Sequence, residues 1–118
     1  MKSMLIQDKS KKFAARIIRF YNYLKEQNQH TLGKQILRSG TSIGANLAEA
    51  ANAQSDKDFL LKLNIALKEC SETKYWLEIL HESEPISKAA FDSIYPDCIE
   101  LEKLLTRSVK TAKSKLQL

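Results

Sequence analysis

The chain has 118 residues, the size of one domain, and its 3 glycines and 2 prolines are too few for an all-β or loop-rich protein. Hydrophobic residues make up 43%, but no apolar run is long enough to span a membrane, and the first residues lack the apolar core of a secretory signal. We therefore expect one mostly helical, cytoplasmic domain over residues 1–118 with no membrane partner. Its net charge of +5 permits binding to an anionic partner but does not indicate which kind of anionic partner.

Four segments have apolar residues spaced by threes and fours, as amphipathic helices do. The first helix is expected over residues 8–28, with an apolar stripe that ends at Leu24, before the polar run EQNQH. The second is expected over residues 32–54, with Thr31 as its N-cap.

The third helix is expected over residues 56–82, where Ser55 and Asp58 form a capping box. Its seam alternates steps of four and three, the rhythm of left-handed helix packing, through Phe59, Leu63, Ala66, Cys70, Thr73, Leu77 and Leu80. The fourth helix is expected over residues 87–114, and Pro96 within it predicts a kink rather than a break. Short connections favour an all-α, antiparallel, up-down-up-down four-helix bundle.

Basic residues gather near both ends of the chain. Residues 1–30 carry seven basic and two acidic side chains, and no acid follows Glu102. In the predicted bundle both termini and the turn before Lys57 share one end, so these cations should meet there. We expect sequence-tolerant, salt-dependent contacts with RNA or DNA phosphates from Lys9, Lys11, Lys12, Arg16, Arg19, Lys110, Lys113 and Lys115. The alternative is ordinary solvation of helix ends.

The third helix carries more apolar surface than its own seam needs. The residues off the seam are Leu60, Leu61, Ile65, Leu67, Trp76 and Ile79. The second helix offers a strip of small residues that would allow close approach, namely Thr41, Gly44, Ala48 and Ala51. These features predict a homo-oligomer. The alternative is that both helices are simply central within one bundle.

The stretch RSGTSIGANLAEAANA (38–53) could be mistaken for a phosphate-binding loop, but no strand precedes its glycines. We interpret Gly40 and Gly44 as sites of close helix packing. Asn46 and Glu49 lie three apart on one side of the helix, and we expect Asn46 to set helix register and Glu49 to pair with a basic residue. Catalysis by Glu49 is the alternative.

Other reactive residues form no recognisable catalytic or metal site. Cys70 and Cys98 have no metal-type spacing, and we interpret them as small buried hydrophobes. Glu78 and His81 have the E-x-x-H spacing of di-iron bundles, but the sequence holds no second copy. We therefore expect that this protein is not an enzyme and that it binds no metal and no cofactor.

Two motifs carry a resemblance to a known family. The pattern S-I-x-x-N-[IL]-A-E at 42–49, which includes Ser42, Ile43, Asn46 and Glu49, and the block ALKECSETKYWL at 66–77 resemble the four-helix bundle proteins of the ribosomal RNA intervening-sequence type. The resemblance runs from about Phe13 to Lys113, with Ala50 and Pro96 as departures. It implies an antiparallel bundle that assembles as a ring of five. It also implies kinship with the accessory proteins of diversity-generating retroelements, basic pentamers that bind reverse transcriptase and nucleic acid.

These observations together predict a non-enzymatic homo-oligomer, a pentamer if the resemblance holds. Its basic surface would bind nucleic acid or a nucleic-acid-processing protein. The alternative is a protein-interaction scaffold that uses the surface around Tyr75 and Trp76 and binds no nucleic acid.

Overall fold

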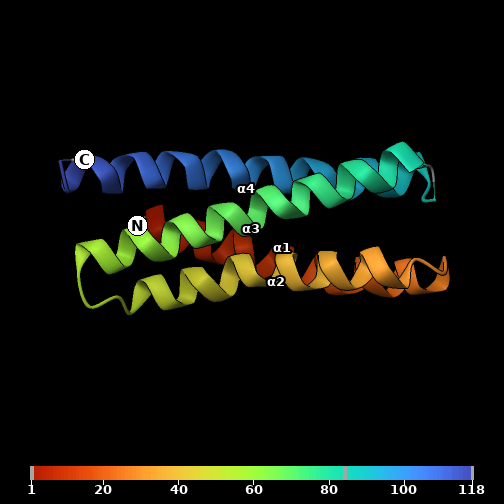
Figure 1. Ribbon diagram of the computed structural model, residues 1–118, viewed down its shortest axis with the longest axis horizontal. Helices are drawn as coiled ribbons and strands as arrows, with labels where there is room; N and C mark the ends of the chain where they lie inside the picture. The colour runs from red at the N-terminus through yellow and green to blue at the C-terminus, as the bar shows by residue number, and fades with distance from the viewer. Residues whose placement is uncertain (1, 84, 118) are drawn as a thin grey trace.

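The computed structural model describes residues 2–83 and 85–117. It contains α1 (Lys2–Glu26), α2 (His30–Ala51), α3 (Asp56–Ser83) and α4 (Lys88–Lys115). The helices pack antiparallel into an elongated bundle of 46 × 22 × 21 Å (Figure 1). Each helix packs extensively against the next in the chain, whereas α1 and α4 are the neighbouring pair with the smallest contact. The four-helix bundle predicted from the sequence is confirmed.

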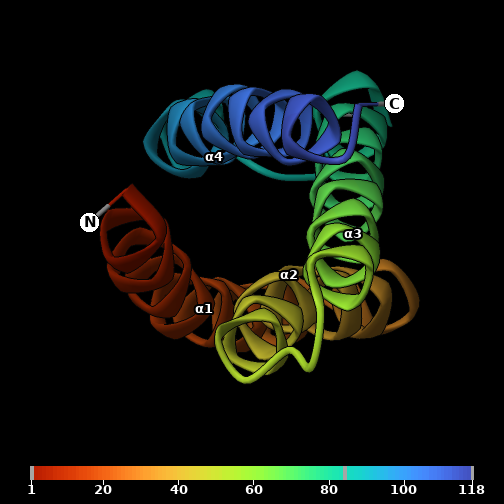
Figure 2. The same ribbon diagram turned by 90° about the vertical axis from the view of Figure 1, so that its left-hand side faces the viewer.

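The two ends of the bundle differ in the parts of the chain they hold. The start of α1, the end of α4 and the turn between α2 and α3 lie at the same end of the bundle, as Figures 1 and 2 show. We call this the terminal end. The connections from α1 to α2 and from α3 to α4 lie at the opposite end. The predicted sharing of one end by both termini and the α2–α3 turn is therefore correct.

The first connection differs from the prediction, because Asn28 ends α1 earlier than expected. Asn28 has a φ of 60°, the left-handed conformation that terminates many helices. The Gln29 N–H donates to the Leu24 carbonyl at 2.8 Å and the Asn28 N–H to the Lys25 carbonyl at 3.0 Å, the bonding pattern of a Schellman motif. Thr31 is not the N-cap of α2, since that helix already begins at His30 after Gln29.

Helices α3 and α4 each begin after a serine whose hydroxyl accepts a hydrogen bond from the first turn. The Ser55 hydroxyl accepts from the Asp58 N–H at 3.1 Å, but the Asp58 carboxylate accepts from the Gln54 N–H, not from that of Ser55. The capping box is therefore half formed. At α4 the Ser87 hydroxyl accepts from the Ala90 N–H at 3.1 Å. The helix then continues unbroken through Pro96.

The core follows the predicted stripes with two exceptions. Leu60 is buried where Phe59 was expected, so Leu60 belongs to the core and not to an outer face. Helix α1 begins at Lys2, six residues before the predicted start, because its stripe continues through Ser10 to Ile6, both buried. A serine within an apolar stripe concealed that periodicity in the sequence.

Both glycines of the 38–53 stretch lie against α1. A Cβ on Gly40 would be 2.8 Å from Cγ1 of Ile17, and one on Gly44 would be 3.3 Å from the Ser10 hydroxyl. Their interpretation as close-packing sites is confirmed for contacts within one chain. Gly44 was also expected to lie in a strip that faces another chain, but the side on which its Cβ would project is occupied by Ser10 of α1.

Two buried pairs tie α3 to its neighbours. The Thr73 hydroxyl donates to that of Ser39 on α2 at 2.8 Å, and both residues are fully buried. On α4, the Cys98 thiol donates to the Cys70 carbonyl at 3.6 Å, while the Cys70 thiol donates to the Cys98 carbonyl at 3.5 Å. This contact with Cys70, together with burial, raises the pKa of the Cys98 thiol. Both cysteines are free and buried, as expected.

Candidate functional site

Two of the predicted cations on α1 are neutralised within the fold. The Lys9 ammonium lies 3.2 Å from the Glu100 carboxylate of α4. Arg16 pairs with Asp97 and donates to the Ser93 hydroxyl at 2.7 Å. These pairs join α1 to α4, two helices that otherwise contact each other little. They leave Lys9 and Arg16 less available for phosphate.

The last part of α4 holds cations that remain free. Lys110, Lys113 and Lys115 are exposed, and none pairs with an acidic side chain in the described part of the chain. Lys103 and Arg107 share both properties and continue the same surface, although they were not among the predicted contacts. The sequence already indicated that Lys103 and Arg107 have no acidic neighbour further along the helix, because Glu102 is the last acidic residue.

The predicted basic cluster is spread out along the bundle axis. Lys9 is level with Glu100, and Lys110 lies ten residues further along α4, about 15 Å at the helical rise. Lys11 and Lys12 are exposed near Lys9, so they do not meet Lys110, Lys113 and Lys115. We call residues 103–115 of α4 the basic strip.

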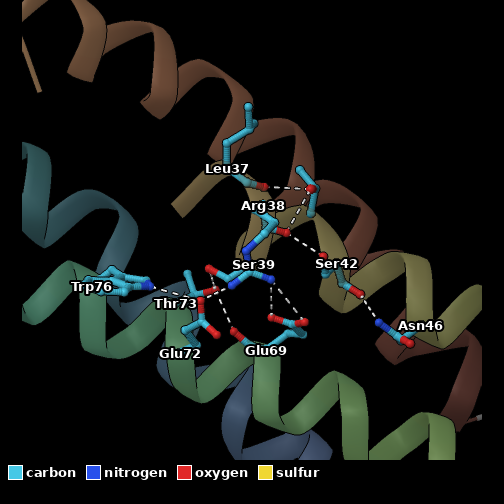
Figure 3. A network of polar contacts seen from close by, with 10 residues as sticks. Leu37, Arg38, Ser39, Ser42, Asn46, Glu69, Glu72, Thr73 and Trp76 are labelled. Atoms are coloured by element: carbon cyan, nitrogen blue, oxygen red, sulfur yellow. Dashed lines mark hydrogen bonds and ion pairs between the residues drawn. The ribbon is translucent and has the colours of Figure 1, made fainter. Parts of the chain in front are cut away.

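Arg38, four residues before the first motif residue Ser42, joins α2 to α3 through a polar network (Figure 3). Arg38 lies 3.2 Å from Glu69 and also pairs with Glu72. The Trp76 indole N–H donates to Glu72 at 3.1 Å. That hydrogen bond and the nearby Arg38 lower the pKa of the Glu72 carboxyl, so it stays ionised. The network lies above the buried Ser39–Thr73 pair and holds α2 against α3.

Of the motif residues themselves, Ser42 and Asn46 bond within α2, Ile43 packs in the core and Glu49 pairs with α3. The Ser42 hydroxyl donates to the Arg38 carbonyl at 2.6 Å, and the Asn46 amide donates to the Ser42 carbonyl at 2.9 Å, so Asn46 bonds within its own helix. Ile43 is fully buried in the core. Glu49 is exposed and lies 2.8 Å from the Lys62 ammonium of α3, the kind of pairing that was predicted.

The outer face of α3 presents large apolar side chains to solvent. Leu61 is 53% exposed and Tyr75 is 54% exposed, while Ile65 is half-buried. Trp76 is half-buried against the core and meets the Tyr75 ring edge to face at 5.2 Å. Leu61 and Ile65 lie one turn apart, and Tyr75 lies further along the same side of α3 beyond Lys68 and Glu72. We call these three apolar residues, which one copy of the chain does not fully cover, the α3 outer face.

The E-x-x-H pair is engaged in other contacts. The Tyr95 hydroxyl donates to the Glu78 carboxylate, and this bond raises the pKa of Tyr95 to about 12. The His81 ring stacks on Phe91 with centroids 4.1 Å apart. Within residues 2–83 and 85–117, no group of three or more metal-ligating side chains could hold an ion.

None of the helices described by the structure is long and apolar enough to cross a membrane.

Comparison with known proteins places these features in a family. The family model of the 23S rRNA-intervening sequence protein matches residues 2–107. A crystal structure of a Bacteroides thetaiotaomicron protein, described as being of unknown function and from the S23 ribosomal protein family, is 52% identical. The match covers 93% of this chain and 99% of that one, with a TM-score of 0.89. Among curated proteins, none matches. Lys110, Lys113 and Lys115 lie beyond the part of the chain that the family model matches.

Proposed function

This chain belongs to the 23S rRNA-intervening sequence protein family, and we propose that it is a non-enzymatic homo-oligomer that binds nucleic acid through the basic strip. The observation that carries the proposal is a run of five cations on one helix with no acid between them, none of which pairs with an acidic side chain among the described residues: Lys103, Arg107, Lys110, Lys113 and Lys115. Lys57, at the start of α3, is exposed at the same end and extends the positive surface.

The charge distribution supports phosphate as the ligand. Lysine and arginine side chains that lie close together without acidic partners repel one another, and a bound polyanion such as nucleic acid relieves that repulsion. No aromatic residue occurs between residues 103 and 115, so bases have no stacking platform there. Binding therefore depends on backbone phosphates, is strongly salt-dependent and tolerates any sequence.

Assembly is the second part of the proposal. The α3 outer face supplies the contact between copies, because large apolar side chains such as Leu61 and Tyr75 gain free energy when they leave water for another chain. The ring of five implied by the family resemblance would present five copies of the basic strip to one nucleic acid and increase avidity. Such repetition suits a protein whose single copy has a net charge of only +5.

The test of nucleic-acid binding compares two triple variants of equal charge. Lys110→Glu/Lys113→Glu/Lys115→Glu reverses the strip, and Lys25→Glu/Lys34→Glu/Lys88→Glu reverses three lysines elsewhere. Fluorescence anisotropy with duplex DNA and structured RNA is measured across a range of salt concentrations. If the strip contacts phosphates, the first variant lowers the slope of log affinity against log salt by about three, about one per lysine, and the control does not. Equal losses in both variants would refute the strip as the site.

The test of assembly is the solution mass. Leu61→Glu should reduce the oligomer to a 13.5 kDa protomer, because it places a charge in the contact between copies. Ile18→Glu is a matched control, since Ile18 on α1 is exposed to a similar extent, 49%. A wild-type chain that is monomeric at micromolar concentration would eliminate the oligomer and leave nucleic-acid binding to be judged by its own test.

A further inference from the structure

The terminal end of the bundle contains a groove to which all four helices contribute. Its volume is about 850 Å³. Its floor is the core of the bundle itself, formed by the buried side chains of Ile6, Leu47, Ala50, Leu63 and Ala112. The half-buried Phe59 and Leu104 and the half-exposed Leu5 form its walls. The interior is therefore apolar and reaches the centre of the bundle.

The sequence explains why this end is hollow. At the opposite end, aromatic rings pack between α3 and α4, with Phe91 stacked on Tyr95 at 4.6 Å and on His81 at 4.1 Å. At the terminal end, positions on the groove hold Ala50, Ala51, Ala53 and Ala112 instead. Figure 2 shows α1 and α4 apart at this end. Small residues therefore line a space that the side chains described by the structure leave unfilled.

The rim of the groove is positively charged. Arg107 and Lys115 line it and are exposed, and neither pairs with a carboxylate in the described residues. Asp56 is the one acidic residue among the lining residues. The hydroxyls of Ser55 and Ser108 also line the groove and can donate hydrogen bonds, whereas the Thr111 hydroxyl already donates to the Arg107 carbonyl at 3.1 Å.

These properties together select a class of ligand. A volume of about 850 Å³ lies within the 300–1,000 Å³ range of small-molecule sites, which are mostly apolar with a few polar groups. Along α4 the lining extends from Leu104 to Lys115, about 16 Å at the helical rise. An elongated apolar space with cations at its edge complements a molecule with one apolar tail and one anionic head.

We propose that the groove binds a long-chain carboxylate, whose acyl chain lies on the apolar floor and whose carboxylate is held at the rim by Arg107 or Lys115. The acyl chain replaces water against leucine, isoleucine and alanine side chains, which favours binding through the hydrophobic effect. The rim cation adds a charge-assisted hydrogen bond that a neutral head group cannot form. This site does not depend on nucleic-acid binding.

The first measurement is isothermal titration calorimetry of the full chain with laurate below its micelle concentration. We expect saturable binding of one laurate per protomer. Dodecyl maltoside, which has a similar tail and a neutral head, should bind about tenfold more weakly, because it lacks the charged hydrogen bond. Absence of saturable laurate binding, or equal binding of the two amphiphiles, would overturn the proposal.

The second measurement places the ligand in the groove. Ala112→Phe fills the floor and should abolish laurate binding, while Ala89→Phe, at an exposed position at the opposite end of the bundle, should leave it unchanged. If Ala112→Phe unfolds the chain, Ala53→Trp fills the same groove from the turn between α2 and α3. Binding that survives every filling variant would show that laurate lies elsewhere.

The third measurement separates this site from the nucleic-acid surface. Arg107→Gln or Lys115→Gln should weaken laurate binding about tenfold, whereas Lys110→Gln, exposed on the same helix but outside the groove, should not. Ala112→Phe should leave nucleic-acid binding intact. If wild-type protein does not bind laurate and Ala112→Phe dissociates its oligomer, a second copy occupies the groove and the proposal fails.

Discussion

Gly40 offers a direct test of how closely α1 and α2 approach. Alanine at this position would place its Cβ 2.8 Å from Cγ1 and 2.9 Å from Cγ2 of Ile17. Ile17 is fully buried, and a β-branched side chain cannot turn both γ carbons aside. The helices must therefore separate or Ile17 must leave its rotamer, and overpacking of this kind costs about 1–3 kcal/mol.

Helix propensity acts in the opposite direction. Replacing glycine by alanine inside a helix stabilises it by about 1 kcal/mol. Because both γ carbons would be closer than ordinary contact, we place the packing cost in the upper half of its range. Gly40→Ala should then lower the free energy of unfolding by about 1–2 kcal/mol.

The sign should reverse when Ile17 is shortened. In an Ile17→Ala background the γ carbons are gone, so Gly40→Ala should raise the free energy of unfolding by about 1 kcal/mol. The coupling between the two sites is then about 2–3 kcal/mol. Ile17→Val is a matched control, because it keeps both γ carbons and Gly40→Ala should remain destabilising in it.

Urea denaturation followed by circular dichroism measures these differences, at one fixed protein concentration because assembly contributes to stability. Gly44→Ala serves as a second control, since its nearest contact is the Ser10 hydroxyl at 3.3 Å and its effect should be smaller. If Gly40→Ala stabilised the wild-type and Ile17→Ala chains equally, the close contact between Gly40 and Ile17 would be refuted.

Three further predictions concern helix ends, helix interior and pH. Asn28→Gly should stabilise the chain by up to about 1 kcal/mol and Asn28→Val should destabilise it by about 1–2 kcal/mol, because position 28 is left-handed; equal denaturation midpoints would contradict this. Pro96→Ala should stabilise α4 by up to about 3 kcal/mol in the same assay, since it restores a helical N–H and removes a clash; a loss of stability would show that the proline is needed. The folded pKa of Tyr95, about 12, exceeds its ordinary value of 10.0, so this group's contribution to stability is complete below pH 10 and declines as the pH rises toward 12. Glu78→Gln should bring that pKa down toward 10.0 in an ultraviolet titration of the phenol, and no change would exclude Glu78 as the main cause.

The proposals for α4 differ in the part of the helix that they use. Nucleic-acid binding uses exposed cations that face solvent, whereas the groove uses the apolar side of the same helix and two cations at its rim. Arg107 and Lys115 belong to both surfaces, and Lys110 belongs only to the first. A ligand in the groove would therefore occupy cations that nucleic acid also needs, and laurate should weaken nucleic-acid binding if both proposals hold.

Local sequence signals decided much of this structure. The three-and-four spacing of apolar residues predicted four helices and nearly all of the core, because burial of one helix face requires that spacing. Ser55 and Ser87 marked helix starts, since a hydroxyl there accepts an N–H that the helix leaves free. The last acid, Glu102, also marked where the free cations of α4 begin.

The packing of the four helices, and not the sequence alone, decided which cations and which small residues remain free to contact a ligand or another chain. Lys9 and Lys110 look equivalent in the sequence, but the alignment of α1 with α4 pairs Lys9 with Glu100 and leaves Lys110 unpaired. Gly44 looked suited to a second chain, but Ser10 of α1 covers it. The groove at the terminal end could not be predicted either, because an alanine in a helix gives no sign of whether a neighbouring helix fills the space beside it. Periodicity is a property of one helix, whereas neutralised charge and unfilled volume depend on which residues of different helices come level with one another.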